Sequence, residues 1–470
     1  MNTIPIMTLN PIIQFDGATV FHGSNLDVLP TLLDNSVDSI VTDPPYELGF
    51  MGKKWDSTGI AYSVELWQEC LRVLKPGGHL LSFGGTRTWH RVAVAIEDAG
   101  FDVRDSIAWM YGSGFPKSLD VSKAIDKAAG AERAEKLGSP TQKRTEKGQL
   151  LTNQRCSVCG KATFSSNPCV CPRPDKIAIT PEAQMWQGWG TALKPAFEPI
   201  VVARKPLIGT VAENVLEWGV GGLNIDGSRI GTNPGYKYNA DRNGTTFHGG
   251  QGERIKQTAE KKGSDVIEST QGRWPANVIL DEYSAGILDE QSGVSKSVVR
   301  PATGKPHLGK ATSVAQSGGT ILDLTDRGHN DSGGASRFFY VAKASKRDRN
   351  EGLDKLPDTM LTGRDPGQDA MQNPHKTRSK ETKNFHPTVK PTDLMRYLIK
   401  LVTPVGGVVL DPFTGSGSTG KAALLDGYRF IGIEMTADYL PIIEGRLRHA
   451  AATREQALQA DQEKEKETLF

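Results

Sequence analysis

Short apolar runs alternate with amphipathic segments at both ends of the chain, and this alternation constrains the fold more than any other feature. The apolar runs have the length of buried strands, and the segments between them carry apolar residues at helical spacing. Such alternation predicts an α/β fold, with a parallel sheet and helices on its faces. The predicted strands lie at 37–46, 78–85, 408–413 and 428–435, and the predicted helices at 67–74, 90–100, 391–402, 419–428 and 437–450.

The middle of the chain differs in composition from both ends. Residues 207–335 are dense in Gly, Ser, Thr and Asn, which is typical of an inserted small domain, and residues 343–385 are polar and charged, which predicts a mobile loop. We expect a main domain in two halves at 14–140 and 336–450, a basic insertion at 141–180, a return to the main sheet at 181–206, a second insertion at 207–335 and a charged tail at 451–470.

Charge and hydropathy narrow the class of protein. There are 56 Lys plus Arg against 54 Asp plus Glu, so any polyanion must meet a local basic face rather than a global field. The longest apolar stretch, 398–410, is interrupted by Lys400, Pro404 and a Gly pair, and is shorter than the ~20 residues that span a bilayer. The N-terminus does not have the pattern of a secretory signal. We expect a cytoplasmic protein with no membrane partner.

The first motif, Asp43-Pro44-Pro45-Tyr46, directly follows the apolar run 38–42. Ligands of open α/β sheets bind beyond the carboxyl ends of strands, so this corner can hold chemistry. The prolines fix the backbone, which holds a carboxylate, the Pro44 carbonyl and an aromatic ring in one rigid place. Two acceptors and a ring suit a planar heterocycle that carries an exocyclic NH2 group. The alternative is a proline-stiffened turn with a buried tyrosine.

The second motif, residues 411–420, lies between a predicted strand and a predicted helix. Gly415 and Gly417 let the backbone turn tightly and approach a ligand, and the amide groups of the following helix point into the same space. The pattern therefore predicts a cofactor-binding loop.

Two ligands compete for this loop. Residues 415–421 satisfy a phosphate-loop pattern, yet Ala422 follows Lys421 where a Ser or Thr should hold Mg²⁺. A nucleoside cofactor instead requires an acid about twenty residues further on to bind the ribose hydroxyls, and Glu434 lies there. The sequence favours the nucleoside cofactor. A glycine-rich turn with an unrelated Glu434 is the alternative.

With both motifs in place, the chain resembles amino-group DNA methyltransferases that depend on S-adenosylmethionine. The order, DPPY first and DPFTGSGS last, is similar to the β class of that family, in which the catalytic half precedes the cofactor half. The HPTVKP stretch at 386–391 matches as well, and several phrases resemble a phage and prophage subgroup of adenine-specific enzymes. The resemblance covers most of 14–450. It implies a Rossmann-like sheet with circularly permuted motif order and a target-recognition domain at 207–335.

The resemblance implies methyl transfer to N6 of adenine in double-stranded DNA, after the base flips out of the duplex. Asp43 and the Pro44 carbonyl would accept the two N–H bonds of the amine, Pro45 would stiffen the corner, and Tyr46 would stack on the base. The cofactor-binding residues that it implies are Asp411, Phe413, Gly415, Ser416 and Gly417 at the methionine part, Glu434 at the ribose, and His386, Thr388 and Lys390 closing over the cofactor.

Other functions stay open on the sequence. Asp rather than Ser before Pro-Pro-Tyr favours adenine, although N4 of cytosine presents the same NH2 group beside a ring nitrogen. A catalytically silent DNA-binding protein of the same fold is the alternative from another class, and the intact motifs argue against it. A homodimer is compatible with the chain. The sequence names no partner endonuclease, so restriction-modification, phage self-protection and a solitary regulatory role are all compatible with it.

Four of the five cysteines lie within sixteen residues, as C-x2-C-G, nine residues and C-x-C. Four thiolates at this spacing complete a tetrahedral structural zinc site of the zinc-knuckle type, and four reduced thiols are the alternative. The surrounding stretch 117–176 holds 12 Lys and Arg against 6 Asp and Glu, so it can contact DNA phosphates or present a solvated helical face. The predicted zinc ligands are Cys156, Cys159, Cys169 and Cys171.

Overall fold

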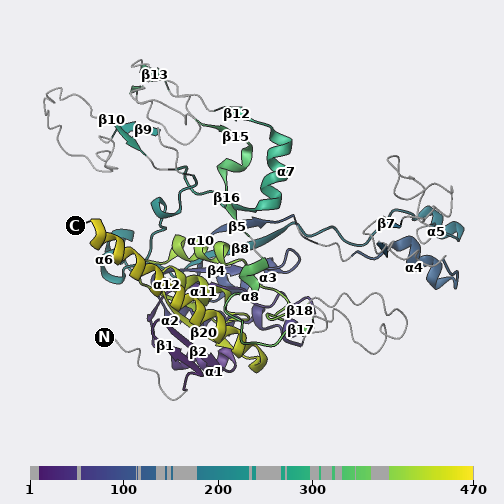
Figure 1. Ribbon diagram of the computed structural model, residues 1–470, viewed down its shortest axis with the longest axis horizontal. Helices are drawn as coiled ribbons and strands as arrows, with labels where there is room; N and C mark the ends of the chain where they lie inside the picture. Colours follow the sequence, from purple (N-terminus) through teal and green to yellow (C-terminus); the bar gives the residue numbers. More distant parts are fainter. Residues whose placement is uncertain are drawn as a thin grey trace. The chain divides into compact units, whose positions relative to one another are not determined.

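In the computed structural model, the chain divides into two compact units (Figure 1). Unit 1 comprises Met1–Gly112 and Phe197–Phe470, and unit 2 comprises Ser113–Ala196. The residues that the structure describes are 10–49, 54–112, 114, 118–133, 143–144, 150–151, 177–231, 236–239, 266–269, 272–296, 306–308, 320–322, 331–343, 346–360 and 381–468.

Unit 1 is built on a ten-stranded sheet. Across the sheet the strands are β1 (Ile13–Phe15), β2 (Ala18–His22), β20 (Arg429–Glu434), β19 (Val408–Asp411), β3 (Val37–Thr42), β4 (Leu74–Phe83), β8 (Phe197–Arg204), β5 (Asp102–Met110), β11 (Val278–Asp281) and β16 (Tyr340–Ala342). Neighbours run parallel from β2 to β4 and from β5 to β16. Strand β8 runs antiparallel to β4 and β5, so the sheet is mixed rather than wholly parallel as expected. The reason is that the chain leaves the sheet after β5 and re-enters it at the same edge, so β8 has to run back.

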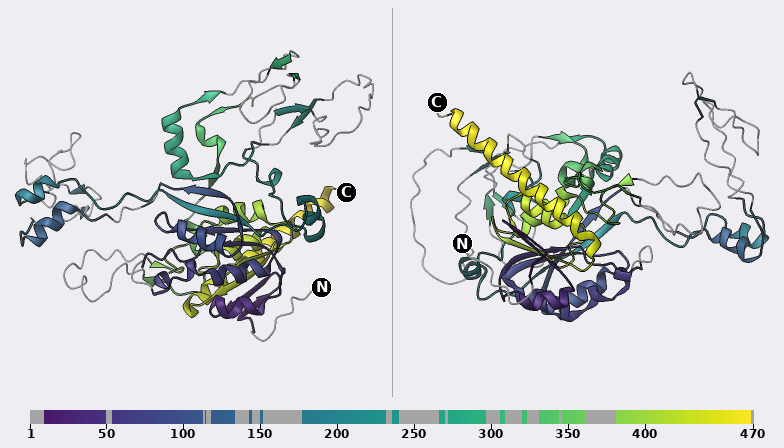
Figure 2. Two further views of the ribbon diagram at one scale, coloured as in Figure 1. Left: turned by 180° about the vertical axis from the view of Figure 1, so that it is seen from behind. Right: turned by 60° about the horizontal axis from the view of Figure 1, so that its bottom comes forward.

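Helices cover both faces of this sheet (Figure 2). The helices on one face lie next to β3 and β4 in the sequence. The helices on the other face precede, connect and follow β19 and β20. The α-helices of unit 1 are α1 (Asn25–Val28), α2 (Val64–Val73), α3 (Trp89–Asp98), α6 (Val211–Trp218), α7 (Glu282–Ser292), α8 (Lys346–Asn350), α10 (Thr392–Val402), α11 (Ser418–Leu425) and α12 (Leu440–Thr468). The 3-10 helices are η1 (Leu29–Thr31), η3 (Lys54–Ser57), η4 (Ile60–Tyr62), η6 (Asp226–Ser228), η8 (Ala335–Phe338) and η9 (Ala437–Tyr439).

The core is split by the sheet into two layers. Ile40 and Leu80 face helices α2 and α3, and their chain neighbours Val41 and Leu81 face helices α10 to α12. This is the period-two alternation of a strand that is buried on both faces. All six residues of β3 are buried, so the residue that follows it is held by a rigid central strand.

The α/β prediction is confirmed for this sheet, since each of the four predicted strands and five predicted helices overlaps an observed element. Two ranges differ from expectation. Strand β11 lies inside 207–335 and joins the main sheet, and α8 lies inside the predicted mobile loop 343–385, where buried ion pairs outweigh its polar composition. The segment boundaries drawn from the sequence stay predictions. Short two-stranded ribbons pair β9 (Tyr236–Asn239) with β10 (Val266–Ser269), β12 (Ser295–Lys296) with β15 (Ser332–Gly333), β13 (Pro306–Leu308) with β14 (Thr320–Leu322), and β17 (Thr359–Met360) with β18 (Glu381–Thr382).

Unit 2 contains helices α4 (Val121–Ala128) and α5 (Pro181–Met185) and a ribbon of β6 (Lys143–Arg144) and β7 (Leu150–Leu151). The Asp126 carboxylate links α4 to the residues directly before α5. It accepts hydrogen bonds from the Ile179 and Thr180 amides and forms an ion pair with Arg133. Burial opposes ionisation, but the Thr180, Arg133 and Ile179 hydrogen bonds outweigh it and hold the Asp126 pKa well below its usual range. Over the residues described in the two units, no helix is long and apolar enough to cross a membrane.

Candidate functional site

The two sequence motifs lie side by side at one edge of the sheet. Strands β3 and β19 are parallel neighbours, with Leu410 opposite Ile40, so their carboxyl ends coincide. The Thr42 hydroxyl donates a 2.6 Å hydrogen bond to Asp411 Oδ1, across 369 positions of sequence. The last residue of β3 is thereby joined to the first residue of the second motif.

The Asp43 corner holds a buried lysine. Lys390 Nζ lies 2.6 Å from Asp43 Oδ2, and it donates to the Tyr46 hydroxyl at 3.2 Å. The same ammonium lies 3.2 Å from Glu198 Oε2, which also accepts the Tyr46 hydroxyl proton at 2.7 Å. The Lys390 side chain is 7% exposed. The corner therefore joins the Asp43 and Glu198 carboxylates, the Lys390 ammonium and the Tyr46 phenol in one network.

Aromatic rings surround this ammonium. Lys390 Nζ lies 4.8 Å from the centroid of the Phe83 ring and 5.3 Å from that of Tyr46. Both distances allow cation–π attraction. The corner therefore favours a positive charge beside Asp43.

Tyr46 is held at its backbone as well as its hydroxyl. The Thr88 hydroxyl donates to the Tyr46 carbonyl at 2.9 Å, and a Cβ on Gly85 would lie 3.2 Å from the Tyr46 ring. Pro44 is buried and Pro45 half-buried, in a backbone without regular structure. The roles of the two prolines, and of the Pro44 carbonyl, stay predictions.

Burial dominates the titration of the Asp43 corner. It raises the pKa of Asp43 above the ordinary value, and Glu198 adds to that effect while Lys390 opposes it. Burial and the two carboxylates hold the pKa of Tyr46 well above its usual range. Burial lowers the Lys390 pKa, but Asp43 and Glu198 outweigh it, so the pKa is raised overall and the amine is charged at neutral pH.

Asp411 is occupied inside its own loop. Its Oδ1 accepts from the Thr42 hydroxyl and the Phe413 amide, and its Oδ2 accepts from the Thr419 hydroxyl at 2.6 Å. Burial raises the pKa of Asp411 to about 6, although these hydrogen bonds lower it. Both oxygens are engaged, so Asp411 shapes the turn that brings Gly415 to the sheet edge.

Glu434, at the end of β20, is joined to the same turn. Its Oε2 accepts from the Gly415 amide at 2.7 Å, and its Oε1 accepts from the Thr436 amide at 2.8 Å. Gly415 has φ +55°, and a Cβ there would lie 3.1 Å from His386 Nε2. The absence of a side chain at Gly415 therefore allows the loop, Glu434 and His386 to come together.

His386 covers this loop as a neutral ring. Burial lowers its pKa to about 4, and its Nδ1 lies 2.8 Å from the Thr388 carbonyl oxygen. The ring contacts Tyr439 edge-on at 4.5 Å between centroids. Thr388 is exposed and holds His386 through its backbone. Of the three residues predicted to close over the cofactor, Lys390 extends instead to Asp43.

The structure adds a buried arginine that the sequence patterns do not single out. Arg446 of α12 is fully buried, and its Nη1 donates to the Ser416 carbonyl and hydroxyl oxygens and to the Ser418 hydroxyl. Burial lowers its pKa to about 10. Gly417, with φ +75°, is the residue from which α11 begins. Arg446 therefore holds residues 416–418 of the loop in place through hydrogen bonds from α12.

Lys421 is the lysine of the phosphate-loop pattern, and it is 1% exposed. Its ammonium binds Asp348 Oδ1 at 2.6 Å and Glu351 Oε2 at 2.9 Å. A lysine held by two carboxylates is not presented to a phosphate. Its geometry agrees with the choice of a nucleoside cofactor over a triphosphate.

The predicted zinc ligands Cys156, Cys159, Cys169 and Cys171 lie outside the described residues. Among the residues whose positions are described, no group of three or more His, Cys, Asp or Glu side chains could hold a metal ion. The fifth cysteine, Cys70, is buried on the inner face of α2, and burial raises the pKa of its thiol.

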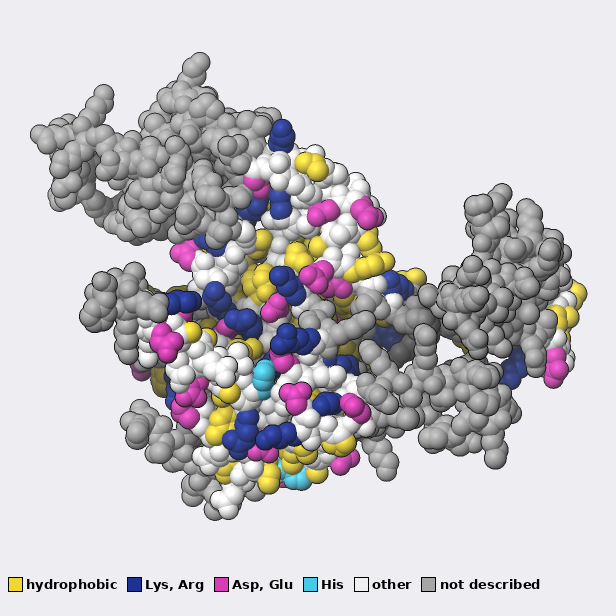
Figure 3. Space-filling view, in the orientation of Figure 1, with side chains coloured by type: hydrophobic (Ala, Val, Ile, Leu, Met, Phe, Trp, Pro, Cys, Tyr) yellow, Lys and Arg dark blue, Asp and Glu magenta, His cyan; other side chains and the backbone are white. Residues whose placement is uncertain are grey.

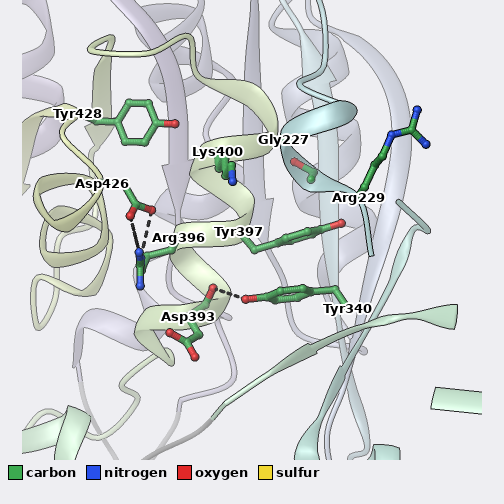
Figure 4. Close-up of a pocket in the computed structure, with 10 residues that line it drawn as sticks. Gly227, Arg229, Tyr340, Asp393, Arg396, Tyr397, Lys400, Asp426 and Tyr428 are labelled. Carbon is green, nitrogen blue, oxygen red and sulfur yellow. Dashed lines mark hydrogen bonds and ion pairs between the residues drawn. The ribbon is translucent and has the colours of Figure 1, made fainter. Parts of the chain in front are cut away.

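A cavity of about 540 Å³ lies elsewhere in unit 1, beside the stacked rings of Tyr340 and Tyr397 (Figure 4). Arg396 in its lining is paired with Asp426 at 2.5 Å. None of the site residues predicted from the sequence is among the described residues that line it. The candidate site is therefore the Asp43 corner together with the Gly415 loop.

The chain is similar to known DNA methyltransferases. The profile of the DNA methylase family (N6/N4 methyltransferases) matches residues 37–148 and 173–445. The type II methyltransferase M2.DpnII of Streptococcus pneumoniae is 48% identical over 62 residues, which are 13% of this chain and 23% of that protein. The DNA adenine methyltransferase YhdJ of Escherichia coli K12 is 46% identical over 55 residues, 12% of this chain and 19% of that protein. The chain thus matches about a fifth to a quarter of the length of these relatives.

Solved structures align over most of the chain at low identity. The PvuII DNA methyltransferase (cytosine-N4-specific) is 12% identical, with 94% of this chain and 90% of that chain covered and a TM-score of 0.41. The complex of M1.HpyAVI with S-adenosylmethionine is 14% identical, with 92% and 99% covered and a TM-score of 0.34.

The family profile spans well over half of the residues, and on that ground the chain belongs to the DNA methylase family of N6/N4 methyltransferases.

Proposed function

We propose that this chain transfers a methyl group from S-adenosylmethionine to the N6 amino group of adenine in double-stranded DNA. The observation that carries the proposal is the junction of the Asp43 corner and the Gly415 loop through the Thr42–Asp411 hydrogen bond. Transfer between a nucleoside cofactor and an amine needs both binding places at neighbouring positions. Membership of the DNA methylase family supports the same class of reaction.

The Gly415 loop fits the cofactor. A carboxylate has about four lone-pair positions, and the Gly415 and Thr436 amides use two of those on Glu434, which leaves acceptors for ribose hydroxyls. When bound, S-adenosylmethionine supplies a sulfonium methyl group whose carbon a nitrogen lone pair can attack, with S-adenosylhomocysteine as the leaving thioether. Phe413, Ser416 and Gly417 would line the methionine part, Asp411 would hold their turn in shape, and His386 with Thr388 would cover the loop.

The Asp43 corner suits the amine. The lone pair of an adenine amino group is delocalised into the ring, so the nitrogen is a weak nucleophile until its geometry becomes tetrahedral. The Asp43 carboxylate and the Pro44 carbonyl would accept its two N–H bonds and favour that geometry. The Tyr46 ring would stack on the base and stabilise the positive charge that develops on nitrogen. Positioning and electrostatics therefore account for the catalysis.

DNA has to deliver a single base to this corner. A base within the duplex cannot reach it, so the base flips out, at an unstacking cost of about a few kcal/mol. The visible face of the described residues mixes Lys and Arg with Asp and Glu, so phosphate contacts on it would be local (Figure 3). We assign target recognition to 207–335, further phosphate contacts to 117–176, and a structural zinc ion to the four clustered cysteines. We also propose that the catalytic half, which carries Asp43, and the cofactor half, which carries Gly415, are circularly permuted in sequence order.

The proposal is tested by transfer of labelled methyl from S-adenosylmethionine to unmethylated phage DNA, with nucleoside analysis of the product. The expected product is N6-methyladenine, made by the wild type and by Asp102→Ala but not by Asp43→Ala. Asp102 is a matched control because it lies at the amino end of β5, with a half-exposed side chain. N4-methylcytosine would retain the mechanism and change the target base. Binding of the methyl donor without transfer to any DNA would favour a silent DNA-binding protein.

A further inference from the structure

Lys390 stands where the proposed function requires the amino group of the target base. Its ammonium donates to Asp43 Oδ2 at 2.6 Å and lies over the rings of Tyr46 and Phe83. An N–H donor on Asp43 and a positive charge beside aromatic rings are also the features of an amine under methylation. One side chain of this chain therefore occupies the corner as the substrate nitrogen would.

We propose that Lys390 is a placeholder for the target amino group, and that Glu198 receives its ammonium when a base enters the corner. The inference rests on the proposed function and deepens it. Lys390 and Glu198 are positioning residues here, because they act through Asp43.

Glu198 is placed to receive the ammonium. Its Oε2 already lies 3.2 Å from Lys390 Nζ and is held by the Tyr46 hydroxyl. It is the second residue of β8, whose antiparallel direction brings its first residues to the carboxyl edge of β4 and β5, opposite Trp109. A small movement of Nζ thus exchanges one carboxylate partner for the other. The buried ammonium is never left unpaired, which would be strongly unfavourable.

Lys390 and Glu198 also act on the charge of Asp43 before DNA arrives. An acceptor for an N–H bond has to be ionised, whereas burial favours the protonated acid. The ammonium of Lys390 opposes that effect, and Glu198 adds to it. The two neighbours therefore act on Asp43 in opposite directions. Among the residues that the structure describes, the charged or titratable groups that act on Asp43 are Lys390, Glu198, Tyr46 and Asp411.

The first test is a titration of Asp43 by carbon NMR, in the full chain without DNA or methyl donor, with the signal assigned by Asp43→Asn. Lys390→Met is expected to raise the Asp43 pKa, and Glu198→Gln to lower it. Lys390→Arg keeps the charge and is expected to restore much of the wild-type value. Lys205→Met is the matched control, because Lys205 is a partly buried lysine at the far end of the β8 segment, bound to Asn35. Unmoved or same-direction shifts in Lys390→Met and Glu198→Gln would overturn the inference.

The second test separates KM for DNA from kcat above the Asp43 pKa. Lys390→Met needs no displacement, so its KM for DNA is expected to fall several-fold. Glu198→Gln leaves the ammonium no second carboxylate, so its KM is expected to rise about tenfold. A purely structural role would raise KM, or lower kcat, in both variants. No transfer by the wild type would contradict the proposed function, and the titration would still support or contradict the placement of Lys390. If either variant does not fold, Lys390→Leu and Glu198→Ala, which remove the same charges, replace them.

Discussion

The Thr42 hydroxyl and the Asp411 carboxylate form the hydrogen bond that joins the two halves of the site. The distance is 2.6 Å, and both side chains are buried. Thr42 is the last residue of β3 and Asp411 is the last residue of β19. The hydrogen bond therefore joins the two strands at their carboxyl ends, where the two motifs begin.

Replacing Thr42 by Val keeps the shape of the side chain and removes this donor. The buried Asp411 oxygen then keeps only the Phe413 amide, so we expect a loss of about 1–3 kcal/mol in the free energy of unfolding. Binding of S-adenosylmethionine should weaken as well, because the turn loses its anchor. Denaturant unfolding and calorimetric titration measure the two effects. Thr31→Val, which removes a local bond to Val28, is the control and should leave donor binding unchanged. Equal donor binding by wild type and Thr42→Val would contradict the prediction.

The raised pKa of Asp411 gives stability a pH dependence with a definite sign. The pKa is about 6 in the folded chain against 3.8 for an ordinary Asp, so the folded chain binds the proton more tightly. This contribution is complete below about pH 4 and is lost as the pH rises through 6, in total about 3 kcal/mol. Asp411→Asn stays uncharged, so its stability relative to wild type should rise by that amount between pH 4 and 8. Unfolding at both pH values measures it. A pH-independent difference between the two proteins would contradict it.

The sequence predicts those parts of the fold and site that follow from local pattern. The central strands, their helices and the meeting of Asp43 with the Gly415 loop follow from strand–helix alternation and from ligand binding at carboxyl ends of strands. The position of Glu198 does not follow from this pattern, because β8 runs antiparallel to its neighbours. In a parallel sheet, Glu198 would lie at the opposite edge, since it is near the start of its strand. The apolar run 199–203 directly after Glu198 is the signal that could have found it.

Buried charges are the other part that pattern does not reveal. Arg446 lies in a helical segment where an arginine is expected to face solvent, and Lys421 satisfies a motif whose ligand it does not meet. Asp348 belongs to a segment whose composition predicts a mobile loop, yet its carboxylate pairs with Lys421. For each of these residues, a partner far away in the sequence determines whether the side chain is buried. No local stretch of sequence contains that partner.

Arg446 should be far more important to stability than its neighbour Arg448. Arg446→Met removes the donor to Ser416 and Ser418 from a fully buried position, and we expect a loss of about 3 kcal/mol with weaker donor binding. Arg448 pairs with Glu444 and lies over the Phe15 ring at the surface, so Arg448→Met should change stability by at most about 1 kcal/mol. Thermal unfolding of the two variants in parallel provides the comparison, and similar losses in both would refute it.

The cysteine cluster makes a prediction about metal content. Elemental analysis of the full chain should find one zinc ion per molecule, and the double variant Cys156→Ser, Cys159→Ser should lose it, because two of four thiolates cannot close a tetrahedral site. Cys70→Ala, which changes the buried core cysteine, should retain the zinc. A wild-type protein without zinc after reconstitution would leave the four thiols reduced and the knuckle assignment wrong.

Gly415 and Gly406 form a pair that separates backbone strain from the binding site. Both have positive φ, +55° and +72°, so an alanine at either position should cost about 1–2 kcal/mol of stability. A Cβ on Gly415 would also lie 3.1 Å from His386 Nε2, whereas a Cβ on Gly406 meets nothing within 4 Å. We therefore expect both Gly415→Ala and Gly406→Ala to lose stability through backbone strain, and Gly415→Ala to lose more because of its contact with His386. Only Gly415→Ala should weaken binding of S-adenosylmethionine, by roughly tenfold or more, because the loop can no longer close against His386 while its amide binds Glu434. Calorimetric titration of both variants decides the matter, since equal affinities would mean that the approach of the Gly415 backbone plays no part in holding the methyl donor.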